Sequence, residues 1–166
     1  MTNRTKRLTT LAALTAAAML LSFVESLIPP IIPVPGVKLG LSNVATLFAL
    51  YRLGWREAAA VAAVRVTLSN LLFGSASGFM YAAAGALLAL VIMMLLKSVA
   101  GLSSPTVSVF GAVAHNVAQI GVSMLILQTE VVIYYLPVLI ISGIVTGLAI
   151  GIIGSMLLKK LEGVRL

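Results

Sequence analysis

The chain has 166 residues, of which 61% are hydrophobic and only 9% are charged, whereas about a quarter of the residues of an ordinary soluble domain carry charge. This composition excludes a soluble globular domain and indicates a protein that is surrounded by lipid. The chain contains no cysteine, so disulfides and thiolate metal sites are excluded. It also contains no aspartate, and its 4 acidic residues are isolated glutamates. Catalysis by paired carboxylates is therefore nearly excluded.

Six apolar runs, each bounded by charges, prolines or glycine clusters, are candidates for membrane-spanning helices. In chain order they cover about residues 8–27, 38–53, 57–73, 79–96, 106–128 and 131–158. About 20 apolar residues are needed to cross a hydrocarbon core of about 30 Å. The second run is short, so it either crosses the membrane or only dips into it. Four prolines between residues 29 and 35 end the first run, because proline removes a backbone donor and clashes with the preceding turn.

The distribution of Lys and Arg predicts the orientation, because cytoplasmic loops retain positive charge. If both termini are cytoplasmic, nine of the 11 basic residues lie on that side, Lys38 lies outside and Arg65 lies within a span. We therefore expect an all-α integral membrane protein, a multi-pass bundle of six helices in a bacterial-type plasma membrane. The net charge of +7 matches anionic lipid headgroups rather than a nucleic acid. A signal peptide is the alternative for the N-terminus, but the apolar run continues past Ala18 for a full membrane thickness.

Small residues recur every four positions in two of these runs. Gly143, Gly147 and Gly151 lie in the last run, and Ala13 and Ala17 lie in the first. In lipid, such spacing lets a second helix approach closely. We interpret the glycines as packing within this chain. For the alanines, internal packing and contact with a partner protein both remain open.

Polar residues inside a membrane are costly, and they usually face the bundle interior or a water-filled cavity. Here they are predicted to line an outward-opening cavity that binds a solute. The candidates are Glu25, Lys38, Asn43, Arg65, Asn70, His115, Asn116 and Gln119. The last three fall on one helix face, because neighbours at i+3 and i+4 share a face. Several of these residues also have a purely structural interpretation. In it, Arg65 is neutralised by Glu25, the two asparagines form hydrogen bonds between helices, and the histidine only packs.

No motif in the chain predicts catalysis. A single histidine without cysteine or paired carboxylates does not supply ordinary zinc coordination. Neither a phosphate-binding Gly-x-x-x-x-Gly-Lys-Ser/Thr loop nor a Gly-x-Ser-x-Gly elbow nor a His-Glu-x-x-His helix is present. We therefore expect no catalytic residue, no metal and no cofactor. Any transport of a solute must then use energy from a partner protein or from an ion gradient.

Three segments carry a resemblance to a known family: residues 35–43 (PGVKLGLSN), 65–74 (RVTLSNLLFG) and 111–119 (GAVAHNVAQ). They resemble the Gx transporter family, also called heptaprenyl diphosphate synthase component I. The wider layout is similar to the substrate-binding S components of energy-coupling-factor (ECF) transporters. In those proteins an Ala-x-x-x-Ala motif docks on a transmembrane coupling subunit, and a loop after the first helix caps an external substrate site. The resemblance therefore implies that Ala13 and Ala17 bind a coupling subunit with associated ATPases.

The two family names imply different functions. Chain-elongating prenyl diphosphate synthases hold magnesium and diphosphate with aspartate-rich motifs, because hard cations prefer carboxylate oxygens. A chain without aspartate is at most an accessory subunit of such an enzyme. We therefore expect the binding component of a vitamin or cofactor-precursor transporter, with a non-catalytic synthase subunit or a purely structural subunit as alternatives. The basic cavity residues favour an anionic or amphiphilic solute.

Overall fold

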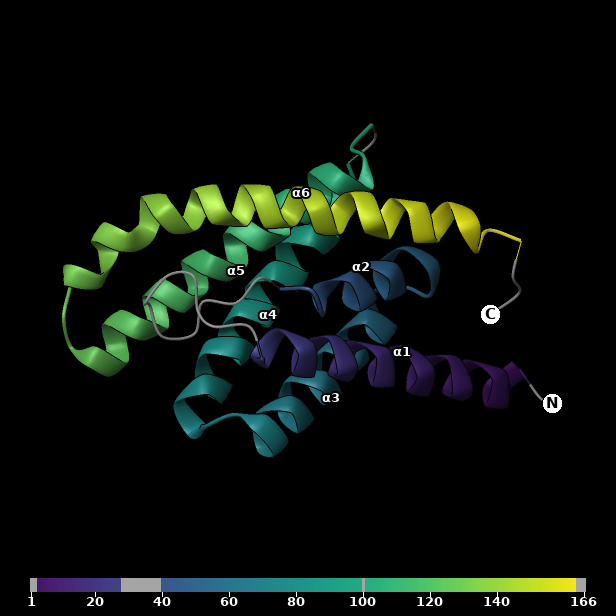
Figure 1. Cartoon of the computed structure of the whole chain (residues 1–166). Helices are drawn as coiled ribbons and strands as arrows, with labels where there is room; N and C mark the ends of the chain where they lie inside the picture. Colours follow the sequence, from purple (N-terminus) through teal and green to yellow (C-terminus); the bar gives the residue numbers. More distant parts are fainter. Residues whose placement is uncertain (1–2, 28–39, 100, 164–166) are drawn as a thin grey trace.

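The computed structural model describes residues 3–27, 40–99 and 101–163, and all regular structure in these residues is helical. These residues form six α-helices and one short 3₁₀-helix, and Figure 1 shows how the helices are arranged. In chain order they are α1 (Asn3–Ser26), α2 (Asn43–Arg52), α3 (Trp55–Phe73), α4 (Ala76–Lys97), α5 (Ser104–Leu127), η1 (Val131–Tyr135) and α6 (Leu136–Lys160).

Within the described residues, four segments are long and apolar enough to cross a membrane: Arg4–Ser26, Ala76–Lys97, Ser104–Leu127 and Val131–Lys160. The chain is thus a multi-pass helical membrane protein. Helix α3 has 19 residues and carries the buried Arg65. Helix α2 has only 10 residues and measures about 15 Å at a rise of 1.5 Å per residue. Of the short run predicted at 38–53, the described part therefore forms a helix too short to cross alone.

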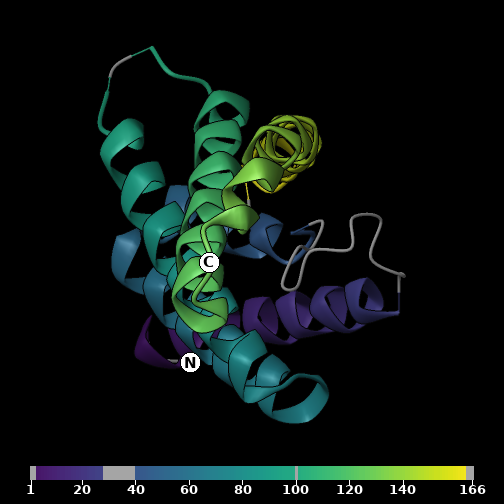
Figure 2. The same cartoon turned by 90° about the vertical axis from the view of Figure 1, so that its left-hand side faces the viewer.

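The helices form two groups of three. Helix α5 lies between α4 and α6 and packs extensively on both, while α1 packs on α3 and α2. Contacts of α2 with α6 and of α3 with α4 join the two groups. In Figure 2, α6 is seen end-on while α1 runs across the view, so these two helices are steeply inclined to each other.

The core centres on α2, in which every residue from Val44 to Leu50 is buried. Leu47 and Leu50 pack in one apolar cluster with Val61 of α3 and Val107 of α5. Helix α2 is therefore surrounded by protein rather than lipid, and this explains how so short a helix is retained within the bundle.

The glycine ridge of α6 packs within the chain, as the sequence predicts, and the helix that it contacts is α5. A Cβ on Gly147 would lie 2.7 Å from Val109 Cα, and one on Gly151 would lie 2.4 Å from Pro105 Cα. Both are backbone atoms, which cannot rotate away. Close backbone approach at these glycines is therefore what allows the α5–α6 interface to form.

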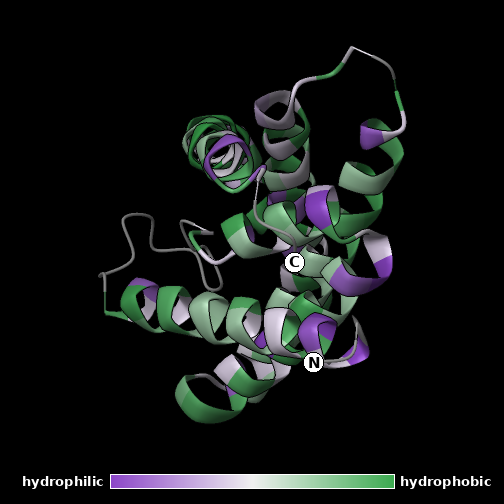
Figure 3. Cartoon of the chain, turned by 90° about the vertical axis from the view of Figure 1, so that its right-hand side faces the viewer, coloured by the Kyte–Doolittle hydropathy of each residue, from purple (hydrophilic) through white to green (hydrophobic). Residues whose placement is uncertain are grey.

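Both chain termini lie at the same end of the molecule (Figure 1). Figure 3 looks at this end and shows hydrophilic residues gathered there, while the helix sides are largely hydrophobic. Polar contacts tie this end together: Arg7 pairs with the buried Glu57, and Lys97 Nζ donates to Leu50 O at 2.6 Å. Arg52 donates to Leu161 O at 2.8 Å. Basic side chains thus bind carbonyls at the C-terminal ends of α2 and α6, where the helix dipole favours positive charge.

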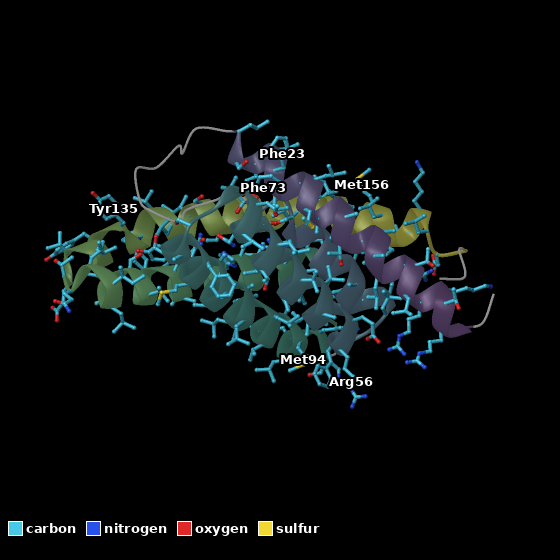
Figure 4. All side chains as sticks on the ribbon, turned by 90° about the horizontal axis from the view of Figure 1, so that it is seen from below. Phe23, Arg56, Phe73, Met94, Tyr135 and Met156 are labelled. Carbon is cyan, nitrogen blue, oxygen red and sulfur yellow. The ribbon has the colours of Figure 1, made fainter. Side chains whose placement is uncertain are left out.

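An aromatic contact lies farther from this end, toward the middle of the molecule (Figure 4). The rings of Phe23 and Phe73 lie 5.1 Å apart between centroids and join the ends of α1 and α3. Figure 4 places Tyr135 and Arg56 toward opposite ends of the molecule, with Phe23 and Phe73 between them. An exposed basic residue at one end and an exposed tyrosine at the other match the anchors expected at two membrane interfaces.

The orientation predicts which loops an external reagent reaches. Single cysteines at the exposed Ser77 and Ser98, at opposite ends of α4, should differ in labelling of intact cells by a membrane-impermeant thiol reagent. We expect Ser77→Cys to react and Ser98→Cys to react only after the cells are opened. Labelling of Ser98→Cys from outside would reverse the orientation.

Candidate functional site

A small polar cavity lies where the two groups of helices meet. Its volume is about 60 Å³. Five helices and the turn before α2 contribute its lining, which consists of Ser22, Glu25, Gly40, Ser42, Asn43, Arg65, Val66, Ser69, Asn70, Gly78, Ala82, His115 and Gln119. A volume of this size holds a few water molecules or a small polar group. It is well below the roughly 300 Å³ of a site that encloses a whole drug-sized ligand.

Arg65 of α3 is the central cation of this cavity, with only 8% of its surface exposed. Its Nη1 donates to Ser42 Oγ, and its Nη2 donates to Asn43 Oδ1 at 3.3 Å. A guanidinium carries five N–H donors, and its Nε is buried without a hydrogen-bond partner. Arg65 therefore retains donor capacity inside the cavity beyond what the protein uses.

Glu25 of α1 supplies the negative charge on the opposite side. It is 6% exposed, and its Oε1 accepts a hydrogen bond from the backbone N–H of Gly40. Its charge also interacts with that of Arg65. Gly40 has a φ of 78°, a conformation that glycine adopts without steric cost. The turn before α2 is therefore attached to α1 through a glutamate that faces the same cavity as the arginine.

Helix α5 contributes His115 and Gln119, which lie one turn apart on the same face. The imidazole of His115 lies directly over Gly85 of α4, where a Cβ would come within 2.6 Å of His115 Cε1. Glycine at this position therefore provides the space that the ring occupies. Asn116 faces another way: it is buried, it does not line the cavity, and its Nδ2 donates to Leu139 O of α6 at 2.7 Å.

The two asparagines that share a Leu-Ser-Asn triplet have different environments. Asn43 accepts from Arg65, whereas Asn70 Nδ2 donates to Val66 O of its own helix at 2.8 Å. Asn70 lines the cavity, but its amide group is engaged near the end of α3. Asn43 is therefore hydrogen-bonded between helices, whereas the printed bond of Asn70 lies within its own helix.

Of the eight predicted site residues, six line the cavity: Glu25, Asn43, Arg65, Asn70, His115 and Gln119. Asn116 lies outside the lining, and Lys38 lies outside the described residues. Three serines were not among the predicted residues: Ser22, Ser42 and Ser69. The Ser69 hydroxyl is buried without a hydrogen-bond partner. It follows Arg65 by one turn, so the spacing of four was a signal that could have identified it.

Chemically, the cavity is rich in hydrogen-bond donors. Arginine, serine, amide and imidazole groups surround a small volume with one carboxylate on its wall. In the part of the chain that the structure describes, no three His, Cys, Asp or Glu side chains lie close enough to hold a metal ion. The arrangement suits a polar group that presents oxygen acceptors to Arg65.

The fold and the cavity define a multi-pass helical membrane protein with a buried polar site between its two helix groups. The sequence model of the heptaprenyl diphosphate synthase component I family matches residues 14–157. The chain belongs to this family, as the three segments predict. No curated protein and no solved structure matches it. The likeness to S components of ECF transporters stays a prediction.

Proposed function

We propose that this protein is the membrane-embedded binding component of an uptake transporter for a small molecule, energised by partner subunits. The observation that carries the proposal is Arg65, a cation enclosed by five helices whose Nε has no hydrogen-bond partner. A cation within a membrane protein is expensive, and such residues usually mark the path or site of a solute. A bound acceptor group would accept from guanidinium donors beyond the two that Ser42 and Asn43 use.

The size and chemistry of the cavity restrict the solute. About 60 Å³ accommodates one polar group rather than a complete vitamin. The donor-rich lining favours a group with oxygen acceptors, and Glu25 adds a place for one donor of the solute. An anionic or amphiphilic molecule, such as a cofactor precursor, meets these requirements.

The first helix supports the proposed docking on a coupling subunit. Ala13 and Ala17 are exposed, while Leu14 and Ala18 turn toward the protein. An exposed ridge of small residues allows another helix to approach closely. Among the residues that the structure describes, none covers this ridge. This favours partner contact over internal packing, the two alternatives that the sequence left open.

The double substitution Ala13→Leu and Ala17→Leu should therefore abolish co-purification of a coupling subunit. The isolated double variant should remain folded, because both positions are exposed. The matched control is Ala149→Leu, another exposed alanine, on α6, which should leave co-purification unchanged. Retention of the partner by a folded double variant would contradict a docking role for this ridge.

The binding role is tested by native mass spectrometry of the gently purified full chain. We expect one small molecule to be retained by the wild-type protein and to be absent from Arg65→Met. Retention of the same molecule by both proteins would show that the cavity is not its site. Failure to retain any molecule, together with no transport ATPase among the co-purified proteins, would refute the proposed function.

The family match favours a second candidate, a non-catalytic membrane subunit that associates with heptaprenyl diphosphate synthase. The absence of aspartate from the chain is consistent with an accessory role, since magnesium and diphosphate are ordinarily held through carboxylates. Co-purification separates the two candidates. A soluble prenyl synthase subunit would favour the second, whereas transport ATPases would favour the first.

A further inference from the structure

An apolar groove lies on the surface between α3 and α4, with a volume of about 380 Å³. Ala62 and Val66 lie deep in it, each only 5% exposed, whereas Ala63 and Leu87 lie at its exposed rim. In lipid, small residues normally let two helices close up on each other. Here α3 and α4 leave a space over their alanines, and an apolar group from outside the chain can enter it across the exposed rim.

The α3 wall of the groove leads to a tryptophan and an arginine. This wall consists of residues 59, 62, 63, 66 and 67. Positions that are three, four or seven residues apart share a helix face. Trp55 precedes Ala59 by four residues and Ala62 by seven, and Arg56 precedes Ala63 by seven. Both residues therefore continue the wall on its own face, about 6 Å or less beyond Ala59 along the helix axis.

The α4 wall ends at the same place. Leu90 is its last lining residue toward the C-terminus of α4, and Met94 follows one turn later. Figure 4 shows Met94 and Arg56 at the same edge of the molecule. Lys97 follows Leu90 by seven residues and shares its face, with its Nζ donating to Leu50 O. One end of the groove therefore lies beside basic side chains and a tryptophan.

The charge at this end of the groove is positive. Arg56 is exposed, its guanidinium carbon lies 5.4 Å from the centre of the Trp55 ring, and it forms no ion pair with any residue that the structure describes. The adjacent acid, Glu57, is 6% exposed and already paired with Arg7. Tryptophan is typical of the depth of lipid headgroups, and a guanidinium binds phosphate oxygens through two parallel hydrogen bonds.

We infer that the groove binds an anionic diacyl phospholipid of the surrounding membrane, with one acyl chain between α3 and α4 and its phosphate at Arg56. The lining on α3 extends from residue 59 to residue 67, about 12 Å at 1.5 Å per residue, and suits an extended hydrocarbon chain. A partner helix is about 10–12 Å across with its side chains, so it would cover the rim rather than enter. The inference is independent of the polar cavity and of the proposed transport function.

The test compares two lipids that have the same chains and differ in head-group charge. The full chain, purified in detergent and stripped of lipid, is titrated with dioleoyl phosphatidylglycerol or dioleoyl phosphatidylcholine, and native mass spectrometry counts the lipids bound. Ala63→Phe fills the groove from its rim, and Ala149→Phe is its matched control, an exposed alanine on α6. Arg56→Gln removes the charge, and Lys159→Gln is its control, an exposed lysine on α6.

We expect the wild type to bind one phosphatidylglycerol at least fivefold more tightly than phosphatidylcholine. Arg56→Gln should weaken phosphatidylglycerol binding about fivefold, or about 1 kcal/mol, and should bind both lipids equally. Ala63→Phe should weaken both lipids about tenfold, because it obstructs the acyl chain itself. Neither control should change either affinity, and the melting temperatures should stay the same because all four positions are exposed.

Three results would overturn the inference. Equal affinity of the wild type for the two lipids would refute a phosphate site at Arg56. Equal binding of phosphatidylglycerol to the wild type and to Ala63→Phe would refute the acyl chain in the groove. A membrane protein that co-purifies with the wild type and is lost from Ala63→Phe, while lipid binding is unchanged, would make the groove a docking surface for a helix. Should Ala63→Phe fail to fold, Thr67→Phe, at another exposed lining position, takes its place in each comparison.

Discussion

Gly147→Leu should unfold or severely loosen the helix group formed by α4, α5 and α6. A Cβ at this position would lie 2.7 Å from Val109 Cα and 2.9 Å from Ala112 Cβ of α5, so the new side chain has no space unless the two helices separate. Overpacking typically costs about 1–3 kcal/mol, and we expect a loss at or above the upper end because the obstacle is backbone. The measurement is the melting temperature of the detergent-solubilised protein.

The matched control for this substitution is Gly121→Leu. Gly121 is an exposed glycine of α5, and a Cβ there would meet nothing within 4 Å. Leucine at this position adds the same bulk and the same loss of backbone freedom in a helix, so it should leave the melting temperature nearly unchanged. Equal melting temperatures for the two variants would show that the glycine ridge does not hold α6 against α5.

Arg65→Met should reduce solute affinity about 100-fold, which corresponds to about 3 kcal/mol. The substitution removes both the charge and the guanidinium donors, and a hydrogen bond to a charged group contributes about 1.5–3 kcal/mol. Arg65→Lys keeps the charge but loses the planar donor fork, so its affinity should lie between those of the wild type and Arg65→Met. The measurement is a titration of the solute identified from the purified protein.

Removing Arg65 also removes a positive charge that interacts with the buried Glu25, so the fold of the variant must be measured together with affinity. Arg56→Met is the control: Arg56 lies on the same helix but is exposed, stacked 5.4 Å from the Trp55 ring. If Arg65→Met collapses the fold while His115→Leu and Gln119→Leu bind the solute normally, the polar cluster is structural and does not bind a solute.

The helical, multi-pass architecture is predictable from sequence because lipid imposes a simple rule on it. Uninterrupted apolar runs must be helical, and charges or prolines must end them. The glycine ridge is predictable for the same reason, since spacing by four places Gly143, Gly147 and Gly151 on one face. What the spacing cannot specify is the neighbour. That α5 rather than another helix receives the ridge depends on how the whole bundle packs.

The cavity is only partly predictable. Arg65 and Glu25 are conspicuous because charges are rare in these runs. The spacing of His115, Asn116 and Gln119 places them on one helix face, but it does not indicate which neighbouring helix each side chain contacts. In the structure Asn116 binds α6, while the other two side chains line the cavity. Ser42 binds Arg65 across 23 positions of sequence, a contact that no local pattern indicates.

The shortness of α2 has a consequence for how the protein enters the membrane. A helix of 10 residues spans about half of the hydrocarbon thickness, so it cannot leave the insertion machinery alone and remain stable in lipid. Its N-terminal Ser42 and Asn43 bind Arg65, the residue that would be most costly to insert on α3. We therefore expect α2 and α3 to be inserted together as a hairpin, with the polar groups already paired. Biogenesis and the binding site would then depend on the same three side chains.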